Sequence, residues 1–278
     1  MPTISSQDPD PAAPEPHRQR QVAESFGVDV ERYDRTRPHY PEELIRRIAA
    51  DAHEVLDVGC GTGIAARQLQ AAGCTVLGVE PDSRMADFAR GRGVDTEVAT
   101  FEDWDRDGRE FDAVTAGQAW HWVDPVAGAR KAAEALRAGG RFTAFWYVLT
   151  TPPAVTEAFA DAYRRVGPDS SFRFPATAEQ ALAGYQAMSA KAAEGIREAG
   201  GFAEPEQWRF DAERTFTRAE WLDQLPTLGS MTQLSPDALT ELLNAVGTAI
   251  DAIGGRFTVP FTTVAVSAER IDPAARRS

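Results

Sequence analysis

The sequence predicts a doubly wound α/β fold, in which a mostly parallel sheet of about seven strands, the last one antiparallel, carries helices on both faces. Short apolar runs typical of buried strands alternate with helical patterns five times over residues 41–149. Glycines end two of these helices, at Gly73 and at 139–140. Two more strand-like runs, at 206–217 and 256–270, are separated by a helical pattern and would extend the sheet.

Apolar spacing and helix-starting residues predict the individual elements. The first helix is expected at 41–51, because Pro41 suits a first turn and apolar residues then recur at helical spacing. Further helices are expected at 64–73, 82–93, 124–140 and 238–253. Strands are expected at 54–59, 75–80, 94–100, 111–119, 141–149, 206–217 and 256–270.

Charge and composition exclude several classes of function. The formal net charge is −13 and no Lys/Arg cluster is present, which disfavours binding to nucleic acid or to anionic lipid. The longest apolar run, 142–149, is too short to span a bilayer, so no membrane attachment and a cytoplasmic location are expected. No acid triad suited to a catalytic divalent metal is recognisable, so no metal is expected.

The segment VLDVGCGTG at 55–63 is the strongest motif. A strand must turn directly into a helix here, and residues without a Cβ permit both the turn and the close approach of a ligand to the backbone. Asp57 can accept a hydrogen bond from the loop or from a ligand ammonium. A dinucleotide site would have G-x-G-x-x-G, but Ile64 occupies the third glycine position. The three glycines of the loop are Gly59, Gly61 and Gly63.

This G-x-G-x-G spacing, with an acid two residues before the first glycine, resembles class I methyltransferases that use S-adenosyl-L-methionine (SAM) and have a Rossmann-like fold. The resemblance implies that Glu80, followed by Pro81 at the end of the second strand, accepts two ribose hydroxyls of SAM. It also implies that the Phe101 backbone meets the adenine ring and that Glu102, or alternatively Asp103, meets the adenine amine.

The segment AGQAWHWVDP at 116–125 follows the fourth strand, at the sheet edge where α/β proteins bind ligands. Its H-W-x-D part resembles type-11 small-molecule methyltransferases, a subgroup that includes trans-aconitate-methyltransferase-like enzymes. The resemblance implies that Gln118 lines the methionine end of SAM and that His121 faces the transfer site or braces the loop. Trp120 and Trp122 are candidate substrate contacts, with core packing as the alternative.

A second part of the same resemblance precedes the first helix. Residues 26–44 are similar to a Y-x-x-x-R-P-x-Y-P entry segment that folds over the cofactor as a lid in this subgroup. The matching positions are Tyr33, Arg37 and Tyr40. A guanidinium suits a carboxylate, so Arg37 is expected to meet the SAM carboxylate, and Tyr40 is expected to contact the substrate.

Methyl transfer is an in-line displacement in which the leaving group is already activated, so a base is needed only for a weakly acidic hydroxyl or an ammonium. His121 is the first candidate for such a base, with Tyr33 and His39 as weaker candidates. The aromatic run 145–147, which contains Trp146, indicates an apolar or planar substrate.

These inferences divide the chain into a disordered leader (1–21), a SAM-binding core with an N-terminal lid (22–149), a helical insertion or cap (150–205) and C-terminal strands and a helix that complete the sheet (206–272). The expected function is methylation of a small molecule at O, N or C, such as a carboxylate or a natural-product scaffold, with S-adenosyl-L-homocysteine (SAH) as product, by a monomer or homodimer. A SAM-binding regulatory or partner protein without turnover is the alternative. A nucleic-acid or protein methyltransferase is disfavoured.

Overall fold

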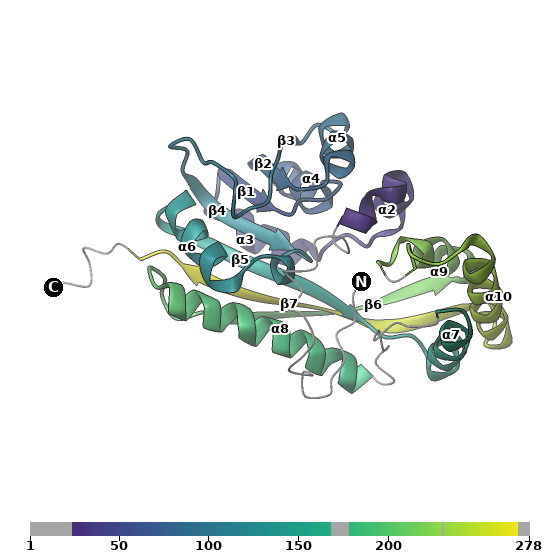
Figure 1. Ribbon diagram of the computed structural model, residues 1–278. Helices are drawn as coiled ribbons and strands as arrows, with labels where there is room; N and C mark the ends of the chain where they lie inside the picture. Colours follow the sequence, from purple (N-terminus) through teal and green to yellow (C-terminus); the bar gives the residue numbers. More distant parts are fainter. Residues whose placement is uncertain (1–23, 168–177, 230, 272–278) are drawn as a thin grey trace.

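The computed structural model describes residues 24–167, 178–229 and 231–271; the leader expected at 1–21 lies outside them. The described residues form a seven-stranded sheet in the order β3-β2-β1-β4-β5-β7-β6 (Figure 1). Neighbouring strands from β3 to β5 are parallel, and β7 runs antiparallel to both β5 and β6. This confirms the predicted mostly parallel sheet with an antiparallel last strand. The strands are β1 (Glu54–Val58), β2 (Thr75–Glu80), β3 (Asp95–Val98), β4 (Phe111–Gly117), β5 (Leu136–Leu149), β6 (Glu206–Thr217) and β7 (Arg256–Glu269).

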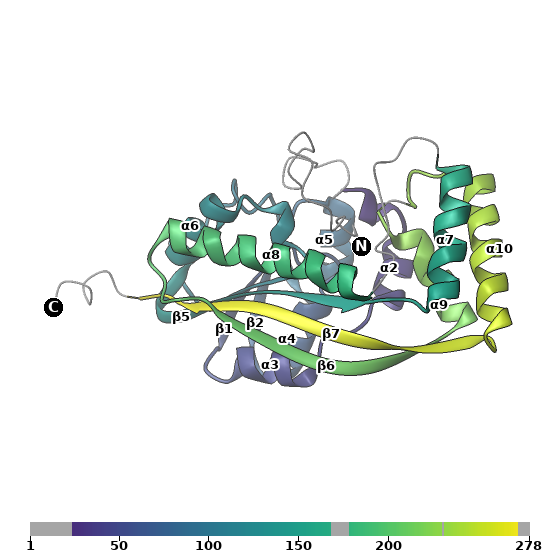
Figure 2. The same cartoon turned by 90° about the horizontal axis from the view of Figure 1, so that it is seen from below.

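Helices cover both faces of the parallel part of the sheet (Figure 2). One face packs with α3 (Glu42–Ala49), α4 (Ile64–Ala71) and α5 (Ser83–Gly91). The other face packs with α6 (Pro125–Ala135) and α8 (Ala178–Ala199). The apolar stripe that predicted the first helix is the face it buries, because Leu44, Ile45 and Ile48 all lie in the core.

The predicted boundary between the helix at 124–140 and the strand at 141–149 is wrong. The helical pattern at 124–140 ends at Ala135, and β5 begins at Leu136, five residues earlier than the sequence indicates. Leu136 pairs with Phe111 at the start of β4, and a register shift follows. The Arg137 side chain is held there by ion pairs with Glu54 and Asp112, so tertiary contacts keep this stretch extended.

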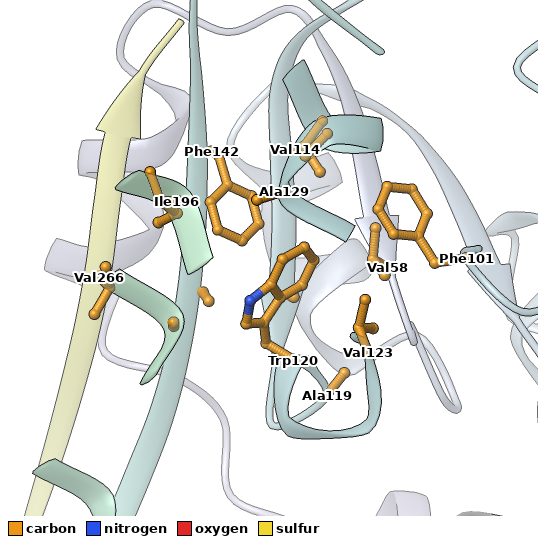
Figure 3. Packing of buried hydrophobic residues seen from close by; sticks show 14 of the residues in the cluster. Val58, Phe101, Val114, Ala119, Trp120, Val123, Ala129, Phe142, Ile196 and Val266 are labelled. Atoms are coloured by element: carbon orange, nitrogen blue, oxygen red, sulfur yellow. The ribbon is translucent and has the colours of Figure 1, made fainter. Parts of the chain in front are cut away.

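The core between the sheet and α6 and α8 contains Trp120, which is 2% exposed (Figure 3). Its ring lies 4.4 Å from the Phe142 ring, measured between centroids, and close to Val123. Figure 3 shows it surrounded by apolar side chains from β4, β5 and the loop between β4 and α6. Trp120 is therefore a core residue, which favours the alternative of core packing over a contact with the substrate.

The far ends of β5, β6 and β7 extend beyond the parallel strands and carry a second group of helices (Figures 1 and 2). These are α7 (Pro153–Val166), α9 (Arg218–Gln224) and α10 (Pro236–Ala252), which share a separate apolar core around Phe216, Trp221 and Phe257. The insertion expected at 150–205 is helical, but its two helices occupy different places. The first, α7, packs on α10, whereas α8 lies along the sheet beside α6.

The N-terminal segment connects these two parts. It consists of η2 (Glu24–Asp29) and α2 (Val30–Thr36). Asp34 forms a 2.7 Å ion pair with Arg67 of α4, and Arg35 forms a 2.9 Å ion pair with Asp223 of α9. No helix in the described parts of the chain is both long and apolar enough to cross a membrane.

The contact between α8 and α6 predicts opposite effects for two glycine-to-alanine changes. A Cβ on Gly195 of α8 would lie 2.5 Å from the Pro125 carbonyl oxygen, so Gly195→Ala should destabilise the fold by about 1–3 kcal/mol. Gly91 of α5 has open space around its Cβ position, so Gly91→Ala should leave stability unchanged or raise it by up to about 1 kcal/mol. Urea unfolding of both variants measures this. Equal midpoints would show that α8 does not pack this closely on α6.

Candidate functional site

A cavity lies at the carboxyl edge of the parallel strands, where the loops after β1, β2, β3 and β4 meet α2 and α8. Most of the predicted site residues line it. These are Tyr33, Arg37, Tyr40, Asp57, Gly59, Gly61, Glu80, Pro81, Phe101, Glu102, Gln118, His121 and Trp122. Gly63, Trp120 and Trp146 do not line it, and neither does His39, which is exposed to solvent.

The glycine turn after β1 forms the floor of the cavity. Gly59 and Gly61 have φ angles of +63° and +57°, in the left-handed region that favours glycine. A Cβ on Gly59 would lie 2.5 Å from the Ala119 Cβ, so the loop after β4 also requires a glycine there. Gly63 is the residue before α4 and faces Val94 instead of the cavity, which gives it a helix-starting position.

Asp57 is a buried acid with one unused oxygen. Its Oδ1 accepts a 3.0 Å hydrogen bond from the Thr115 hydroxyl, and Oδ2 has no hydrogen-bond partner within the described residues. Burial raises the pKa of Asp57 to about 7, and the Thr115 hydroxyl and the backbone amide of Ala66 oppose this shift. A buried carboxylate oxygen without a partner is costly, so it indicates a site for a ligand that supplies a donor or a positive charge.

Glu80 ties the end of β2 to the glycine turn. Its Oε2 accepts a 2.9 Å hydrogen bond from the Gly61 amide, and Oε1 accepts a 3.0 Å bond from the Asp82 amide. Burial raises the pKa of Glu80 to about 7, while these two amides oppose the shift. Each carboxylate oxygen has two lone pairs, so both can accept a further hydrogen bond from a ligand in the cavity.

Arg37 is the only Lys or Arg among the described residues that line the cavity, and it is 5% exposed. Its Nη2 donates a 2.7 Å hydrogen bond to the Thr227 carbonyl, and its guanidinium lies 4.5 Å from the centre of the Tyr33 ring. Nε and Nη1 have no hydrogen-bond partner in the described part of the chain. A buried guanidinium with two unused donors fits a planar anion such as a carboxylate.

The loop after β3 provides an apolar wall and a polar end. Phe101 is buried, and Glu102 lines the cavity while its Oε1 accepts a 3.0 Å hydrogen bond from the Asp124 amide. Asp103 is exposed and accepts a 2.7 Å hydrogen bond from the Thr100 hydroxyl outside the cavity. Of the two acids considered from the sequence for the adenine amine, Glu102 lines the cavity and Asp103 does not.

Gln118 is held in a conformation that is unusual for a residue with a side chain. Its φ is +56°, and its amide donates a 2.8 Å hydrogen bond to the Phe145 carbonyl. Its Nε2 donates a 3.3 Å bond to the Tyr147 carbonyl. A residue with a side chain is strained in the left-handed region and persists there only where the surrounding structure holds it. Such residues are found often at functional sites. The strain therefore supports a functional position for this loop.

Trp146 lies behind His121 and does not reach the cavity. It is 1% exposed, and its indole Nε1 donates a 3.2 Å hydrogen bond to His121 Nδ1. Trp146 was expected to contact the substrate, but the structure places it outside the lining of the cavity. Successive residues of a strand point to opposite faces, and in β5 it is Tyr147 that lines the cavity. Burial lowers the pKa of His121 to about 3, so its imidazole is neutral.

Other residues that line the cavity were not named as site residues from the sequence. Phe26 is in the segment expected to form a lid, Tyr147 belongs to the aromatic run 145–147, and Tyr185 and Met188 of α8 were not singled out at all. Tyr185 and Met188 are three positions apart on one helix face, a spacing that by itself cannot be distinguished from core packing. In the described residues no group of three or more His, Cys, Asp or Glu side chains could hold a metal ion.

Comparison with known proteins identifies a domain within this chain. Residues 56–144 match the family model described as a methyltransferase domain. Over 130 residues the chain is 40% identical to proteins of Mycobacterium bovis and Mycobacterium tuberculosis named uncharacterized methyltransferases. That alignment covers 46% of this chain and 54% of each relative, so the chain spans about half the length of the curated relatives it matches.

Solved structures extend the similarity beyond that domain. A structure from Anaeromyxobacter dehalogenans, assigned as a type II methyltransferase, is 26% identical with a TM-score of 0.59, and the match covers 85% of this chain and 99% of that one. Phosphoethanolamine N-methyltransferase 2 of Haemonchus contortus, in complex with SAM, has a TM-score of 0.51 at 15% identity. The match covers 94% of this chain and 61% of that protein, and it shows a shared fold.

The raised pKa values of Asp57 and Glu80 predict a distinctive pH dependence of stability. Both groups are protonated in the folded protein up to about pH 7 but ionise near pH 4 when unfolded, so their contribution is full below about pH 4 and is lost as pH rises through 7. Asp57→Asn removes one of these groups. Its melting temperature should therefore exceed that of the natural protein at pH 8, and the difference should shrink towards pH 5.

The control for this experiment is Asp95→Asn, which changes an exposed carboxylate at the start of β3. Its melting temperature should follow that of the natural protein at every pH. Parallel pH curves for Asp57→Asn and the natural protein would contradict the assignment of a raised pKa to Asp57.

Proposed function

We propose that this chain, whose residues 56–144 match a methyltransferase domain, is a class I methyltransferase that transfers the methyl group of SAM to a small-molecule acceptor held in this cavity. The observation that carries the proposal is Asp57 Oδ2, a buried carboxylate oxygen that accepts no hydrogen bond from the described residues and lies beside a turn of left-handed glycines. SAM carries an ammonium group, and an ionised Asp57 would supply the charge and the lone pair that this group requires.

The remaining groups of SAM find complementary partners in the same cavity. The two oxygens of Glu80 would accept the ribose hydroxyls, with Pro81 beside them. Phe101 and Glu102 would hold the adenine ring and its amine. The unused Nε and Nη1 of Arg37 would bind the carboxylate of the methionine part. The arrangement supports SAM over a dinucleotide, because Ile64 opens α4 where a dinucleotide fingerprint requires glycine.

The acceptor is proposed to be small and at least partly planar. Aromatic side chains from α2, β5, α8 and the loop after β4 line the same cavity: Phe26, Tyr33, Tyr147, Tyr185 and Trp122. They would close around a compact molecule and exclude water, which favours methyl transfer because the reaction depends mainly on positioning and desolvation. The net charge of −13 opposes a nucleic-acid acceptor.

We also propose that residues 24–40 act as a lid over SAM. This segment contributes cavity-lining residues and is attached to the rest of the protein by the Asp34–Arg67 and Arg35–Asp223 ion pairs and, at its end, by the buried ring of Tyr40. Ligand contacts at Arg37 would add to these attachments. A SAM-binding protein without turnover remains the alternative function, and formation of SAH in the presence of a metabolite mixture distinguishes it from an enzyme.

The first prediction from this proposal concerns ligand choice. Calorimetric titration should give micromolar binding of SAH and no binding of NAD. Glu80→Ala should weaken SAH binding by about 1–3 kcal/mol, roughly 10-fold to 100-fold, because it removes hydrogen-bond acceptors for the ribose and for the Gly61 amide. Glu110→Ala, an exposed acid before β4, is the matched control and should bind SAH normally. NAD binding without SAH binding would refute the proposal.

A second prediction concerns the lid. Amide hydrogen exchange over residues 24–40 should slow when SAH binds, because Arg37 gains a ligand contact within this segment. Asp34→Asn weakens the attachment to Arg67, so exchange without ligand should be faster in this variant than in the natural protein. Exchange that is the same with and without SAH would show that the segment is a fixed wall.

A further inference from the structure

The contact between Trp146 and His121 determines which imidazole nitrogen carries the hydrogen. The indole Nε1 is a donor and cannot accept, and it lies 3.2 Å from His121 Nδ1. Nδ1 must therefore offer its lone pair to the indole. In a neutral imidazole the hydrogen then resides on Nε2.

Two features keep the imidazole neutral. A protonated ring would carry a hydrogen on Nδ1, and this hydrogen would face the indole N–H, so two donors would oppose each other. Burial in the cavity wall also lowers the pKa of His121 to about 3. The ring of Trp122, with its centre 4.8 Å from that of the imidazole, adds apolar surface and no charge.

The hydrogen on Nε2 has no partner in the described part of the chain, although His121 lines the cavity. A buried donor without an acceptor is unfavourable by about 1–3 kcal/mol, so this group is placed to meet a ligand. A nitrogen that already carries a hydrogen cannot take a proton from a substrate. The expectation that His121 is a general base is therefore at odds with its hydrogen bond to Trp146.

The other ionisable groups of the cavity offer no replacement for such a base at this place. Glu80 and Glu102 accept hydrogen bonds from backbone amides of the chain, and Asp57 belongs to the proposed ammonium site. Burial raises the pKa of the Cys60 thiol and of the Tyr40, Tyr147 and Tyr185 hydroxyls, so these groups stay protonated. Apart from the Tyr33 hydroxyl, the ionisable groups among the described residues that line the cavity are thus protonated, bonded to backbone groups or assigned to the ammonium of SAM.

We propose that His121, oriented by Trp146, is a neutral hydrogen-bond donor that selects an acceptor whose reactive oxygen is already ionised, such as a carboxylate. This rests on the proposed function. In the reaction a lone pair of the oxyanion forms the O–CH3 bond, the S–CH3 bond breaks, and its electron pair stays on the sulfur of SAH. The product is a methyl ester, the sulfonium charge and the carboxylate charge are both removed, and no proton moves.

Within this proposal His121 contacts the substrate, and Trp146 is a positioning residue that acts through it. Two substitutions of His121 separate the functions of its two nitrogens. Glutamine can place an amide N–H near the position of Nε2, so His121→Gln keeps the donor. Asparagine is shorter and reaches only the position of Nδ1, so His121→Asn keeps a partner for Trp146 but loses the donor. Trp146→Phe keeps the packing of the ring but removes the hydrogen bond.

The first measurement is the tautomer, which requires no acceptor. Protein labelled with ¹⁵N-histidine is studied by NMR, and the His121 signals are assigned by their loss in His121→Gln. We expect Nε2 to carry hydrogen and Nδ1 to be unprotonated across the pH range from about 5 to 8. In Trp146→Phe, signals of the other tautomer or of the protonated ring should appear. A hydrogen on Nδ1 in the natural protein would overturn the donor assignment.

The second measurement is ligand selection by the SAH-loaded protein. The probes are benzoate and cinnamate, with benzylamine and cinnamylamine as cationic counterparts of similar outline. The carboxylates should bind at least about 10-fold more tightly than the amines. His121→Gln should stay within a few-fold of the natural protein. His121→Asn and Trp146→Phe should lose about 10-fold to 100-fold in carboxylate affinity while their SAH affinity is unchanged.

The outcomes separate this inference from the proposed function. Equal binding of amines and carboxylates, binding of neither, or natural carboxylate affinity in His121→Asn would overturn the selection of an oxyanion. Failure of the natural protein to bind SAH would refute the proposed function instead, and the NMR experiment would still decide the state of His121. Melting temperatures of all three variants identify any that fail to fold.

Discussion

The hydrogen bond from the Gly61 amide to Glu80 is the interaction on which the geometry of the site depends. It connects the turn after β1 to the end of β2, and the Gly59 and Cys60 amides reinforce this connection by donating to the Val79 carbonyl. The turn can approach β2 this closely because its glycines have no Cβ and adopt positive φ angles. Every other group of the cavity is arranged around this fixed turn, including the loop after β4, whose Ala119 leaves no room for a side chain at Gly59.

The cavity contains three buried polar groups that the described residues satisfy only in part. Asp57 has a free oxygen, Arg37 has two free nitrogens, and His121 has one. Each is unfavourable in the absence of a ligand, and together they reduce the stability of the empty protein. The large apolar cores on both faces of the sheet can compensate this cost, which is the usual relation between a rigid scaffold and a strained functional site.

The long strands β5, β6 and β7 link the cavity to a second apolar core. They extend past the parallel strands and support α7, α9 and α10 (Figure 1). Thr227, next to α9, accepts the hydrogen bond from Arg37 through its carbonyl. A cavity residue near the N-terminus is thus oriented by a carbonyl about 190 positions later in the chain. The ion pairs of Arg35 with Asp223 reinforce the same connection at the surface, where they contribute little to stability by themselves.

The local sequence by itself determined the parallel sheet, the glycine turn and the acids at the ends of β1 and β2, because strand and helix periodicity and left-handed glycines are encoded within a few neighbouring residues. It also placed Gln118 and His121 at the edge of the cavity. The sequence did not show which of Trp120, Trp122 and Trp146 line the cavity and which pack in the core. An aromatic residue near a strand end suits a core and a binding site equally well. Only the tertiary structure decided that Trp120 packs under α6, that Trp146 orients His121 and that Tyr185 of α8 reaches the cavity. Those outcomes depend on which distant element covers each side chain, and that information is absent from local spacing.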